Sequence, residues 1–252
     1  MTLINKILGT SFAIGCGILS LSPLRAAEYT PTYVWAGYVF DTDLDGNGNS
    51  IDLDGPTIIA GELDQASVNR LERALLRFSM PAIPEGETIV SATLRLYVTG
   101  VPTSVSPAQL YWSNDSKTLA NNYSSSYYQN TTFVNTGLQV ASTSTTANSW
   151  VELNVTSFVL SDYANSGSTT YSWFRIQVDG LTFVEDNFSR RYGFASDNHA
   201  DPTLRPQLII VTASNIPEPS TYGVLFAGVV GLWAATRRRI VRHQTASKNG
   251  GA

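Results

Sequence analysis

Three separate segments of the chain alternate apolar and polar side chains with a period of two residues. In residues 92–98 every second side chain is apolar, so one face collects Ala92, Leu94, Leu96 and Val98. Residues 150–155 and 173–178 show the same period. Because a period of two places successive side chains on opposite faces of an extended chain, these segments are predicted to be β-strands with one face buried.

The rest of the central region also favours β-structure. Residues 73–78 and 207–211 are two further expected strands, and turn-rich stretches such as 84–87 and 165–168 lie between the strands. No long stretch has the 3.6-residue period of an amphipathic helix, and only short helical turns are expected, within residues 156–164. The sequence therefore predicts an all-β domain, an antiparallel jelly-roll-like β-sandwich whose two sheets share one core.

The central region is large enough for one domain, and it is acidic. The chain has 252 residues, and both ends resemble targeting segments, which leaves residues 28–214 for a folded core. This region holds nineteen acidic and nine basic residues, so its net charge has the wrong sign to attract a phosphate backbone. Nucleic acid is therefore not an expected partner. Lysine is scarce and Ser, Thr, Asn and Tyr are abundant, which is more typical of exported surface proteins.

The N-terminus has the three regions of a secretory signal. Lys6 precedes an uncharged run over residues 7–24, and small residues follow at Ala26 and Ala27. We expect a signal peptide over residues 1–27, forming a helix before its removal, with cleavage near one of the two alanines. The mature protein is then exported.

Two alternatives for this segment remain open. The apolar run is long enough to serve as an uncleaved membrane anchor, and the residues that end at Cys16 also fit the acylation site of a lipoprotein. Cys16 is the only cysteine in the chain. After cleavage at the preferred site the protein would contain no cysteine, so it would fold by burying a core, without disulfides or cysteine metal sites.

An apolar segment near the C-terminus lies between an acidic residue and an arginine cluster. The 18 residues between Glu218 and Arg237 carry no charge. As a helix they would extend about 27 Å, close to the roughly 30 Å hydrocarbon core of a bilayer. We expect a transmembrane helix over about residues 220–236, whose arginines stay at the cytoplasmic headgroups and leave the preceding domain outside. The alternative is a buried helix of a soluble protein.

Three features occur in order at this end of the chain: Pro217, Glu218 and Pro219, then the apolar span, then Arg237, Arg238 and Arg239. Together with a signal peptide, this order resembles the PEP-CTERM sorting signal of Gram-negative bacteria. The resemblance covers residues 215 to about 242, and we assign the sorting segment to 215–252. It implies that an exosortase, a membrane cysteine transpeptidase, cuts a membrane-anchored precursor near the PEP motif and releases the protein to the outer surface or exopolysaccharide matrix. The tail over residues 243–252 departs from the family, whose members often stop sooner.

The order of the central strands carries a second resemblance. The matching segments are 73–78, 89–98, 150–155, 194–196 and 205–208, and residues 68–73 read Val-Asn-Arg-Leu-Glu-Arg. Over about residues 60–212 the chain resembles the DNRLRE domain, which is related to carbohydrate-binding modules of the disaggregatase and alginate-binding kind. The resemblance implies a jelly-roll-like sandwich. Because the matches are mostly core positions, it carries no functional residue over.

An acidic segment is the candidate metal site. Counting Asp41 as position 1, oxygen-bearing side chains fall at positions 1, 3, 5, 9 and 12 and a glycine at position 6, the spacing of a loop that wraps calcium. The candidate ligands are Asp41, Asp43, Asp45, Asn47 through its backbone carbonyl, Asn49 and Asp52. Position 12 is Asp where such loops carry the longer Glu, and the flanks resemble strands. A solvated acidic β-turn is therefore an equal alternative to a calcium site that orders residues 41–54.

Signals for catalysis are sparse. Before the sorting segment the chain has one histidine, His199, and no Gly-x-Ser-x-Gly motif, so a nucleophilic triad or a histidine-rich metal centre lacks its parts. We expect no catalytic residue. An extracellular polysaccharide-active enzyme that uses two carboxylates stays the alternative, because the acidic residues offer many pairs.

Aromatic residues favour a binding role. Aromatic rings stack on sugar rings, with polar groups nearby to fix their orientation; the candidate glycan contacts are Trp112, Tyr123, Tyr127, Tyr128, Trp150 and Trp173. The alternation puts Trp150 and Trp173 opposite the apolar faces of their strands, either half-exposed or under a loop. The sequence thus predicts an exported structural or glycan-binding protein, whose partners are an exosortase, the membrane and polysaccharide. A permanently anchored protein is a further alternative.

Overall fold

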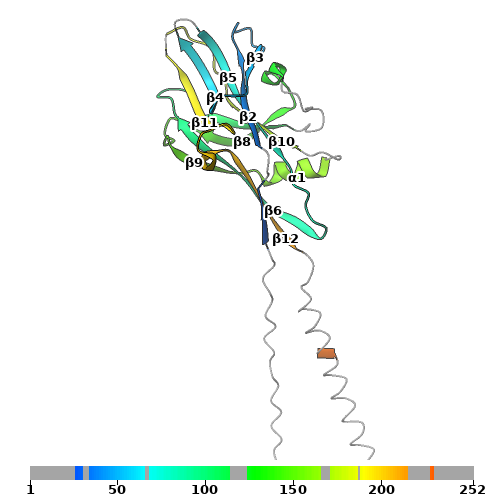
Figure 1. The fold of residues 1–252 in the computed structure, drawn as a ribbon. Helices are drawn as coiled ribbons and strands as arrows, with labels where there is room; N and C mark the ends of the chain where they lie inside the picture. Colours follow the sequence, from blue (N-terminus) through cyan, green and yellow to red (C-terminus); the bar gives the residue numbers. More distant parts are fainter. Residues whose placement is uncertain are drawn as a thin grey trace, which may run out of the picture. The chain divides into compact units, whose positions relative to one another are not determined.

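A computed structural model describes residues 26–30, 34–65, 68–113, 124–165, 171–186, 188–214 and 228–229. The elements in chain order are β1 (Ala26–Tyr29), β2 (Val34–Asp41), β3 (Ser50–Asp52), β4 (Thr57–Gln65), β5 (Val68–Ser79), β6 (Glu87–Gly100), β7 (Ala108–Ser113), the 3-10 helix η1 (Ser125–Tyr128), β8 (Phe133–Ala141), β9 (Ser149–Asn154), α1 (Thr156–Asn165), β10 (Tyr171–Val178), β11 (Arg190–Ala195), the 3-10 helix η2 (Pro202–Leu204) and β12 (Gln207–Ser214). The described chain is therefore mostly β-structure, as predicted (Figure 1).

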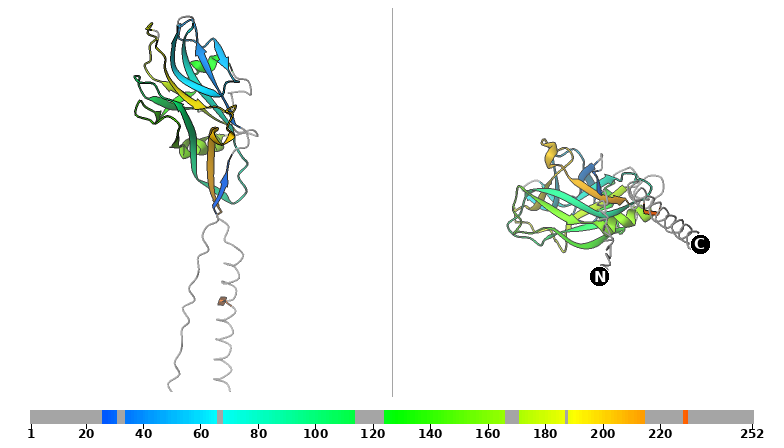
Figure 2. Two further views of the ribbon diagram at one scale, coloured as in Figure 1. Left: turned by 60° about the vertical axis from the view of Figure 1, so that its left-hand side comes forward. Right: turned by 90° about the horizontal axis from the view of Figure 1, so that it is seen from below.

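The strands pair antiparallel in one continuous path of order β1-β12-β6-β11-β4-β5-β10-β7-β8, with β9 added to β6, and β2 and β3 added beside β5. The path curls into two layers around one core (Figure 1, Figure 2). Leu208 of β12 and Leu110 of β7 come from distant parts of this path, and both belong to the same buried cluster. The antiparallel sandwich is thus confirmed, whereas its jelly-roll description stays a prediction.

Each predicted strand lies in or overlaps an observed one. The alternating face of residues 92–98 belongs to β6, where its four apolar side chains are fully buried while their neighbours are not. Residues 73–78, 150–155, 173–178 and 207–211 fall in or overlap β5, β9, β10 and β12. Periodicity alone therefore located these elements, because each buries one face in the shared core.

The short helical turn expected at 156–164 is the helix α1. Its Val159 is buried in the core, and its Asp162 accepts hydrogen bonds from Trp112 Nε1 at 3.1 Å and from the Ser172 hydroxyl at 2.6 Å. α1 therefore packs against β7 and β10 through a buried carboxylate whose lone pairs have partners.

Gly61 makes the connection between the two layers. It pairs with Arg191 of β11 and with Glu72 of β5, where β4 passes from one layer to the other. Its φ is 143°, and a Cβ at this position would lie 2.2 Å from the Arg190 carbonyl oxygen. Only glycine fits here without moving β11.

One layer buries its second face as well. Val39, Leu75 and Trp173 of β2, β5 and β10 pack with Tyr127 and Tyr128 of η1 in a smaller cluster outside the main core. The segment around η1 thus covers the outer side of these strands. This cover places η1 next to the functional site.

Most of the predicted targeting segments lie outside the described residues. In the described part of the chain, no helix is long and apolar enough to cross a membrane. Of the span predicted at 220–236, only Gly228 and Val229 are described, and both are helical. Ala26 and Ala27, the residues expected at signal cleavage, lie in β1 opposite Ala213 and Thr212 of β12.

Candidate functional site

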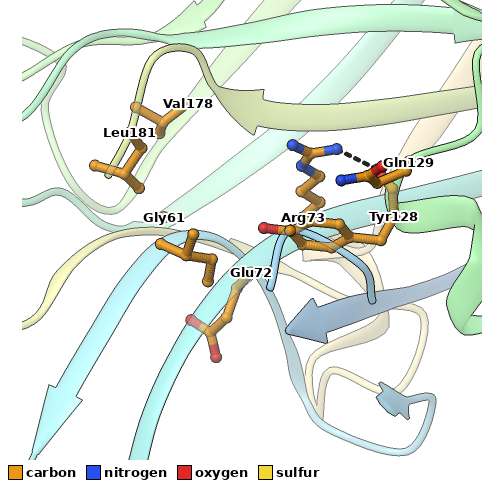
Figure 3. Close-up of a pocket in the computed structure, with 9 residues that line it drawn as sticks. Gly61, Glu72, Arg73, Tyr128, Gln129, Val178 and Leu181 are labelled. Carbon is orange, nitrogen blue, oxygen red and sulfur yellow. Dashed lines mark hydrogen bonds between the residues drawn. The ribbon is translucent and has the colours of Figure 1, made fainter. Parts of the chain in front are cut away.

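A cavity of about 170 Å³ lies where the first residues of β5 meet η1 and the end of β10 (Figure 3). Its polar wall contains Arg73, Tyr128 and Gln129, and its remaining lining is Gly46, Gly61, Leu71, Glu72, Val178 and Leu181. These residues come from segments far apart in the sequence. The volume equals about five or six water molecules, which is the scale of a single small ring.

Arg73 shapes the polar wall. Its guanidinium carbon lies 3.9 Å from the centre of the Tyr128 ring, and its Nη1 donates to the Tyr128 carbonyl. Figure 3 shows Arg73, Tyr128 and Gln129 close together at this wall. Burial lowers the pKa of Arg73, but the guanidinium remains charged at neutral pH. The pocket therefore has a fixed cation stacked on an aromatic ring.

A second arginine holds the same turn from the neighbouring strand. Arg175 Nη1 donates to the carbonyls of Tyr127 at 3.0 Å and Tyr128 at 2.9 Å, and the guanidinium also lies over the ring of Phe133. Burial, helped by the nearby positive charge of Arg73, lowers the pKa of Arg175 to about 9. Arg175 does not line the pocket. It supports η1 from beneath, while Arg73 reaches the cavity.

Glu72 is a buried carboxylate in the pocket lining. Its Oε1 accepts from Arg70 Nε at 2.7 Å, and its Oε2 lies 3.7 Å from Arg191 Nη1, too far for a hydrogen bond. Burial raises the pKa of Glu72, and the two arginines oppose that shift. Figure 3 shows this carboxylate pointing away from Arg73 and Tyr128, so it holds Arg70 and Arg191 and does not face the polar wall.

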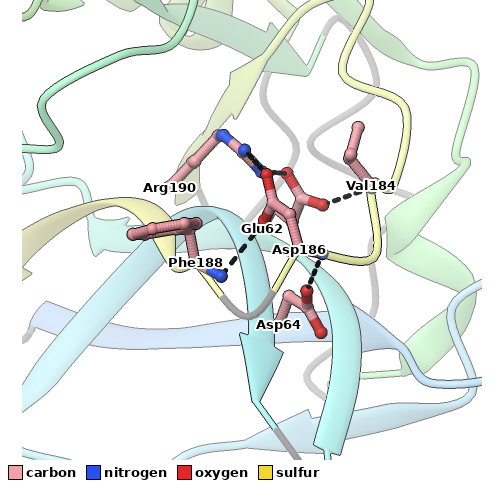
Figure 4. Close-up of polar contacts among 6 residues, drawn as sticks. All are labelled: Glu62, Asp64, Val184, Asp186, Phe188 and Arg190. Carbon is pink, nitrogen blue, oxygen red and sulfur yellow. Dashed lines mark hydrogen bonds and ion pairs between the residues drawn. The ribbon is translucent and has the colours of Figure 1, made fainter.

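The loop after β10, which supplies Leu181 to the pocket, is anchored by two carboxylates of β4 (Figure 4). Glu62 accepts from the backbone N–H of Val184, and Asp64 accepts from that of Asp186, each at 2.6 Å. Arg190 bridges Glu62 and Asp186. Because buried charged groups fix the loop backbone at several points, this wall of the pocket is held by β4 and β11.

The acidic segment borders the pocket through Gly46. It forms the loop of the hairpin between β2 and β3, and it packs on η1 so closely that a Cβ at Gly48 would lie 2.3 Å from Tyr128 Cβ. The carboxylates of Asp41, Asp43 and Asp45 gather within 4.8 Å of one another. The structure thus brings the carboxylates of Asp41, Asp43 and Asp45 together beside the cavity.

Of the other three candidate ligands, Asn47 and Asn49 lie in hydrogen-bond contact with Asp45 and Asp43, whereas Asp52 lies elsewhere. Asn47 donates through Nδ2 to Asp45, and Asn49 Oδ1 accepts from Thr42. Asp52 lies on β3 opposite Tyr38, accepts its hydroxyl at 2.9 Å, and also accepts from backbone amides that follow β3. An antiparallel hairpin places position 12 on the returning strand, so the carboxylate of Asp52 is not among the clustered ones.

Asp41 itself is fully buried and already has partners. Its two carboxylate oxygens accept from the backbone N–H groups of Leu44 and Gly46, each at 2.8 Å. Burial and the hydrogen bond with Asp43 raise the pKa of Asp41, and the same bond lowers that of Asp43. The two carboxyls therefore titrate as a pair, and Asp43 and Asp45 are the exposed oxygens on which a cation would act.

Most of the aromatic residues predicted to contact glycan are buried in the structure. Trp112 and Trp173 are 8% and 0% exposed, because Trp112 packs in the main core and Trp173 packs against Tyr127 under η1. They present no ring face to a ligand. Tyr127 is also buried, Tyr128 borders the pocket from a largely buried position, and Tyr123 lies outside the described residues.

Trp150 differs from these residues. It is only partly buried, on the outward face of β9, and packs edge-to-face with Tyr97 of β6. The alternation had predicted a half-exposed or loop-covered position for Trp150 and Trp173, and both outcomes occur, one for each residue.

His199, the one histidine before the sorting segment, does not line the pocket. His199 stands in the turn before η2, where its Nδ1 accepts the Asp201 backbone N–H and its carbonyl accepts from Arg205. The sorting residues Pro217, Glu218, Pro219, Arg237, Arg238 and Arg239 lie outside the described residues.

Sequence reasoning missed Glu72 and Arg73, whereas it did single out Tyr127 and Tyr128 of the turn that also carries Gln129. One signal was available for the arginines: Arg73, Leu75 and Arg77 share one face of a strand whose other face is apolar. A strand face that carries both arginines and a leucine is expected to be covered by another segment, which supplies hydrogen-bond partners for the arginines. No sequence pattern indicated that residues 124–130 would form that cover.

The pocket suits a small polyhydroxylated ligand. It combines a charged donor, an exposed amide and apolar walls within one small cavity, the mixture that orients neutral or charged polar rings in binding sites. Its carboxylates are engaged in ion pairs and backbone hydrogen bonds. The arrangement therefore supports recognition more directly than proton transfer.

Comparison with known proteins agrees with a recognition role. No curated protein matches the chain. The profile of carbohydrate-binding module family 96 matches residues 59–212, which is more than half of the chain. Binding modules of this kind attach to carbohydrate, and the match contains every pocket residue except Gly46. The chain therefore belongs to carbohydrate-binding module family 96.

Proposed function

We propose that this protein is an exported, non-catalytic component that binds polysaccharide at the pocket between β5, η1 and the loop after β10. The observation that carries the proposal is the family match over residues 59–212, because it includes the arginine, tyrosine and glutamine of the polar wall. The rigid support of that wall adds to it, since binding groups that are already held in place lose little entropy on binding.

The location follows from the two ends of the sequence. The secretory signal at residues 1–27 and the PEP-CTERM-like segment at 215–252 support delivery through an exosortase to the outer surface or exopolysaccharide matrix of a Gram-negative bacterium. In that setting a binding module would attach the protein to the polymer around the cell. The apolar span then serves as a temporary membrane anchor until the transpeptidase acts.

Affinity electrophoresis of the full chain in detergent, through gels that contain the host's exopolysaccharide, tests the binding site. The variant Gln129→Ala removes an exposed pocket side chain, and Gln139→Ala removes an exposed glutamine of β8 that is outside the pocket. We expect the polymer to retard the wild type and Gln139→Ala, and to retard Gln129→Ala less. Equal retardation of all three would contradict the site, and no retardation of the wild type would contradict polysaccharide binding.

Two further measurements separate the alternatives. Release of reducing ends from the same polymer, abolished by a single carboxylate substitution, would contradict a non-catalytic role. Mass spectrometry of protein recovered from membrane, medium and matrix fractions tests delivery. We expect the matrix form to lack residues after the PEP motif, whereas an intact C-terminus in every fraction would indicate a permanently anchored protein.

A further inference from the structure

The outward face of β9, β6 and β12 is a three-strand surface that the main core leaves open. Tyr97 of β6 pairs with Trp150 of β9, and Arg95 pairs with Glu152 on one side and with Gln207 of β12 on the other. None of these five side chains is buried, whereas the intervening residues of β6 are fully buried in the core. The face is therefore partly exposed and has a defined register.

Arg95 stands at the centre of this face with each end of its guanidinium engaged. Its Nε donates to Glu152 Oε1 at 2.8 Å, and its Nη1 donates to Gln207 Oε1 at 3.0 Å. The guanidinium carbon also lies 4.5 Å from the centre of the Trp150 ring. Contacts in three directions restrict the long side chain, so it presents its remaining donors from a fixed position.

The aromatic pair has its own fixed geometry. The rings of Tyr97 and Trp150 meet at 71° with their centroids 5.5 Å apart, an edge-to-face contact. Trp150 stays partly exposed, and the guanidinium of Arg95 beside it can donate hydrogen bonds. An apolar ring flanked by an arginine, a carboxylate and an amide matches a sugar, which presents C–H groups on one face and hydroxyls at its edge.

The charges of the face narrow the ligand class. Among its five outward side chains, one arginine and one glutamate form an ion pair, so their charges cancel. A surface without net charge does not attract an acidic polysaccharide more strongly than a neutral one. We propose that this face is a second carbohydrate site, which binds a neutral polysaccharide chain by stacking on Trp150 with hydrogen bonds to Arg95, Glu152 and Gln207.

The inference extends the proposed polysaccharide-binding function and rests on it. The second site shares no residue with the pocket and uses different strands. Two independent sites on one chain allow the protein to hold two polymer segments at once, and simultaneous engagement strengthens attachment to a matrix without any new contact.

The test is affinity electrophoresis of the full chain in detergent, in gels that contain a mixed-linkage β-glucan, a galactomannan or a dextran. Trp150→Ala removes the stacking ring, and Trp150→Phe keeps a smaller ring in case the alanine variant unfolds. Ile209→Ala is the matched control, because it shortens a side chain on the same outward face of β12 without touching the aromatic pair. Circular dichroism reports whether each variant is folded.

We expect at least one of these neutral polymers to retard the wild type, with a dissociation constant about tenfold higher for Trp150→Ala and a smaller increase for Trp150→Phe. Ile209→Ala should bind as the wild type does. If folded Trp150→Ala also binds as the wild type does, or if none of the three polymers retards the wild type, the second site is refuted. The pocket is tested by a separate experiment, which compares Gln129→Ala with the wild type in gels that contain the host polymer.

Discussion

Arg73 touches both the ring and the carbonyl of Tyr128, so one side chain of β5 fixes the last residue of η1 at the pocket wall. Arg175 on the adjacent strand β10 holds the preceding carbonyl of the same turn. A short 3-10 turn has little stability of its own. The two arginines therefore fix η1 to the sheet, so that the pocket wall it forms is held in place.

Replacing Arg73 with lysine should weaken polysaccharide binding while the fold persists. Lysine keeps the charge but loses the planar group that stacks on Tyr128 and donates in a fork. We expect the dissociation constant, measured by titration calorimetry with the host polymer, to rise about tenfold. Arg205→Lys, directly after η2, is the control and should bind normally. An unchanged affinity of folded Arg73→Lys would show that the stacked guanidinium is not part of the site.

The two tryptophans of β9 and β10 should differ sharply in their effect on stability. Trp173→Ala removes a fully buried ring from the cluster under η1, and a loss of about 3–5 kcal/mol in the free energy of unfolding is expected. Trp150→Ala removes an outward ring that makes cross-strand contacts, and a loss of about 1 kcal/mol is expected. Urea unfolding followed by circular dichroism measures both. Similar losses would contradict the different burial of the two side chains.

The stability contribution of Glu72 should depend on pH. Because burial raises the pKa of Glu72 in the folded state, the carboxyl favours folding when it is protonated, and this contribution is lost as the pH rises through the raised value. Glu72→Gln should therefore have a higher melting temperature than the wild type near neutral pH. The difference should shrink as the pH falls toward about 4.3, the ordinary glutamate pKa.

Thermal unfolding of both proteins over a pH series checks this expectation, with the exposed Glu152→Gln as the control. A melting temperature of Glu72→Gln below that of the wild type at neutral pH would show that the ion pairs with Arg70 and Arg191 outweigh the cost of burying the charge.

Calcium binding at the hairpin between β2 and β3 stays a prediction of the sequence. The structure gathers the carboxylates of Asp41, Asp43 and Asp45 but places Asp52 elsewhere, so a bound ion would take its remaining oxygens from backbone carbonyls or water. We expect millimolar Ca²⁺ to raise the melting temperature, a chelator to reverse the rise, and Asp43→Asn with Asp45→Asn to abolish it. If titration with Ca²⁺ releases no heat and leaves the melting temperature unchanged, calcium binding at this hairpin is excluded.

The sequence predicted the strands because their alternation records which face is buried. Residues 92–98 are the clearest example, since the apolar members are all in the core. The same alternation placed Trp150 and Trp173 away from the main core. It did not distinguish the exposed face of β9 from the covered face of β10, because the cover comes from η1, more than 40 residues earlier in the chain than β10.

The pocket was beyond sequence reasoning for a related reason. Gly61 lets β4 pair with both β11 and β5, and η1 packs on β5 and β10, which brings Arg73 near Gln129. Long-range pairing sets these distances, and no local pattern encodes them. The calcium spacing shows the same limit, since a pattern that suits a loop between helices lies on a β-hairpin, where Asp52 is on the returning strand opposite Tyr38.

Hydrogen–deuterium exchange on the full chain in detergent, with and without the host's exopolysaccharide, tests the central claim most directly. Binding at the pocket should slow amide exchange in residues 124–130 and 71–73, and the slowing should disappear in Arg73→Lys. Slowed exchange confined to other segments, or exchange unaffected by saturating polymer, would contradict a carbohydrate site at Arg73, Tyr128 and Gln129.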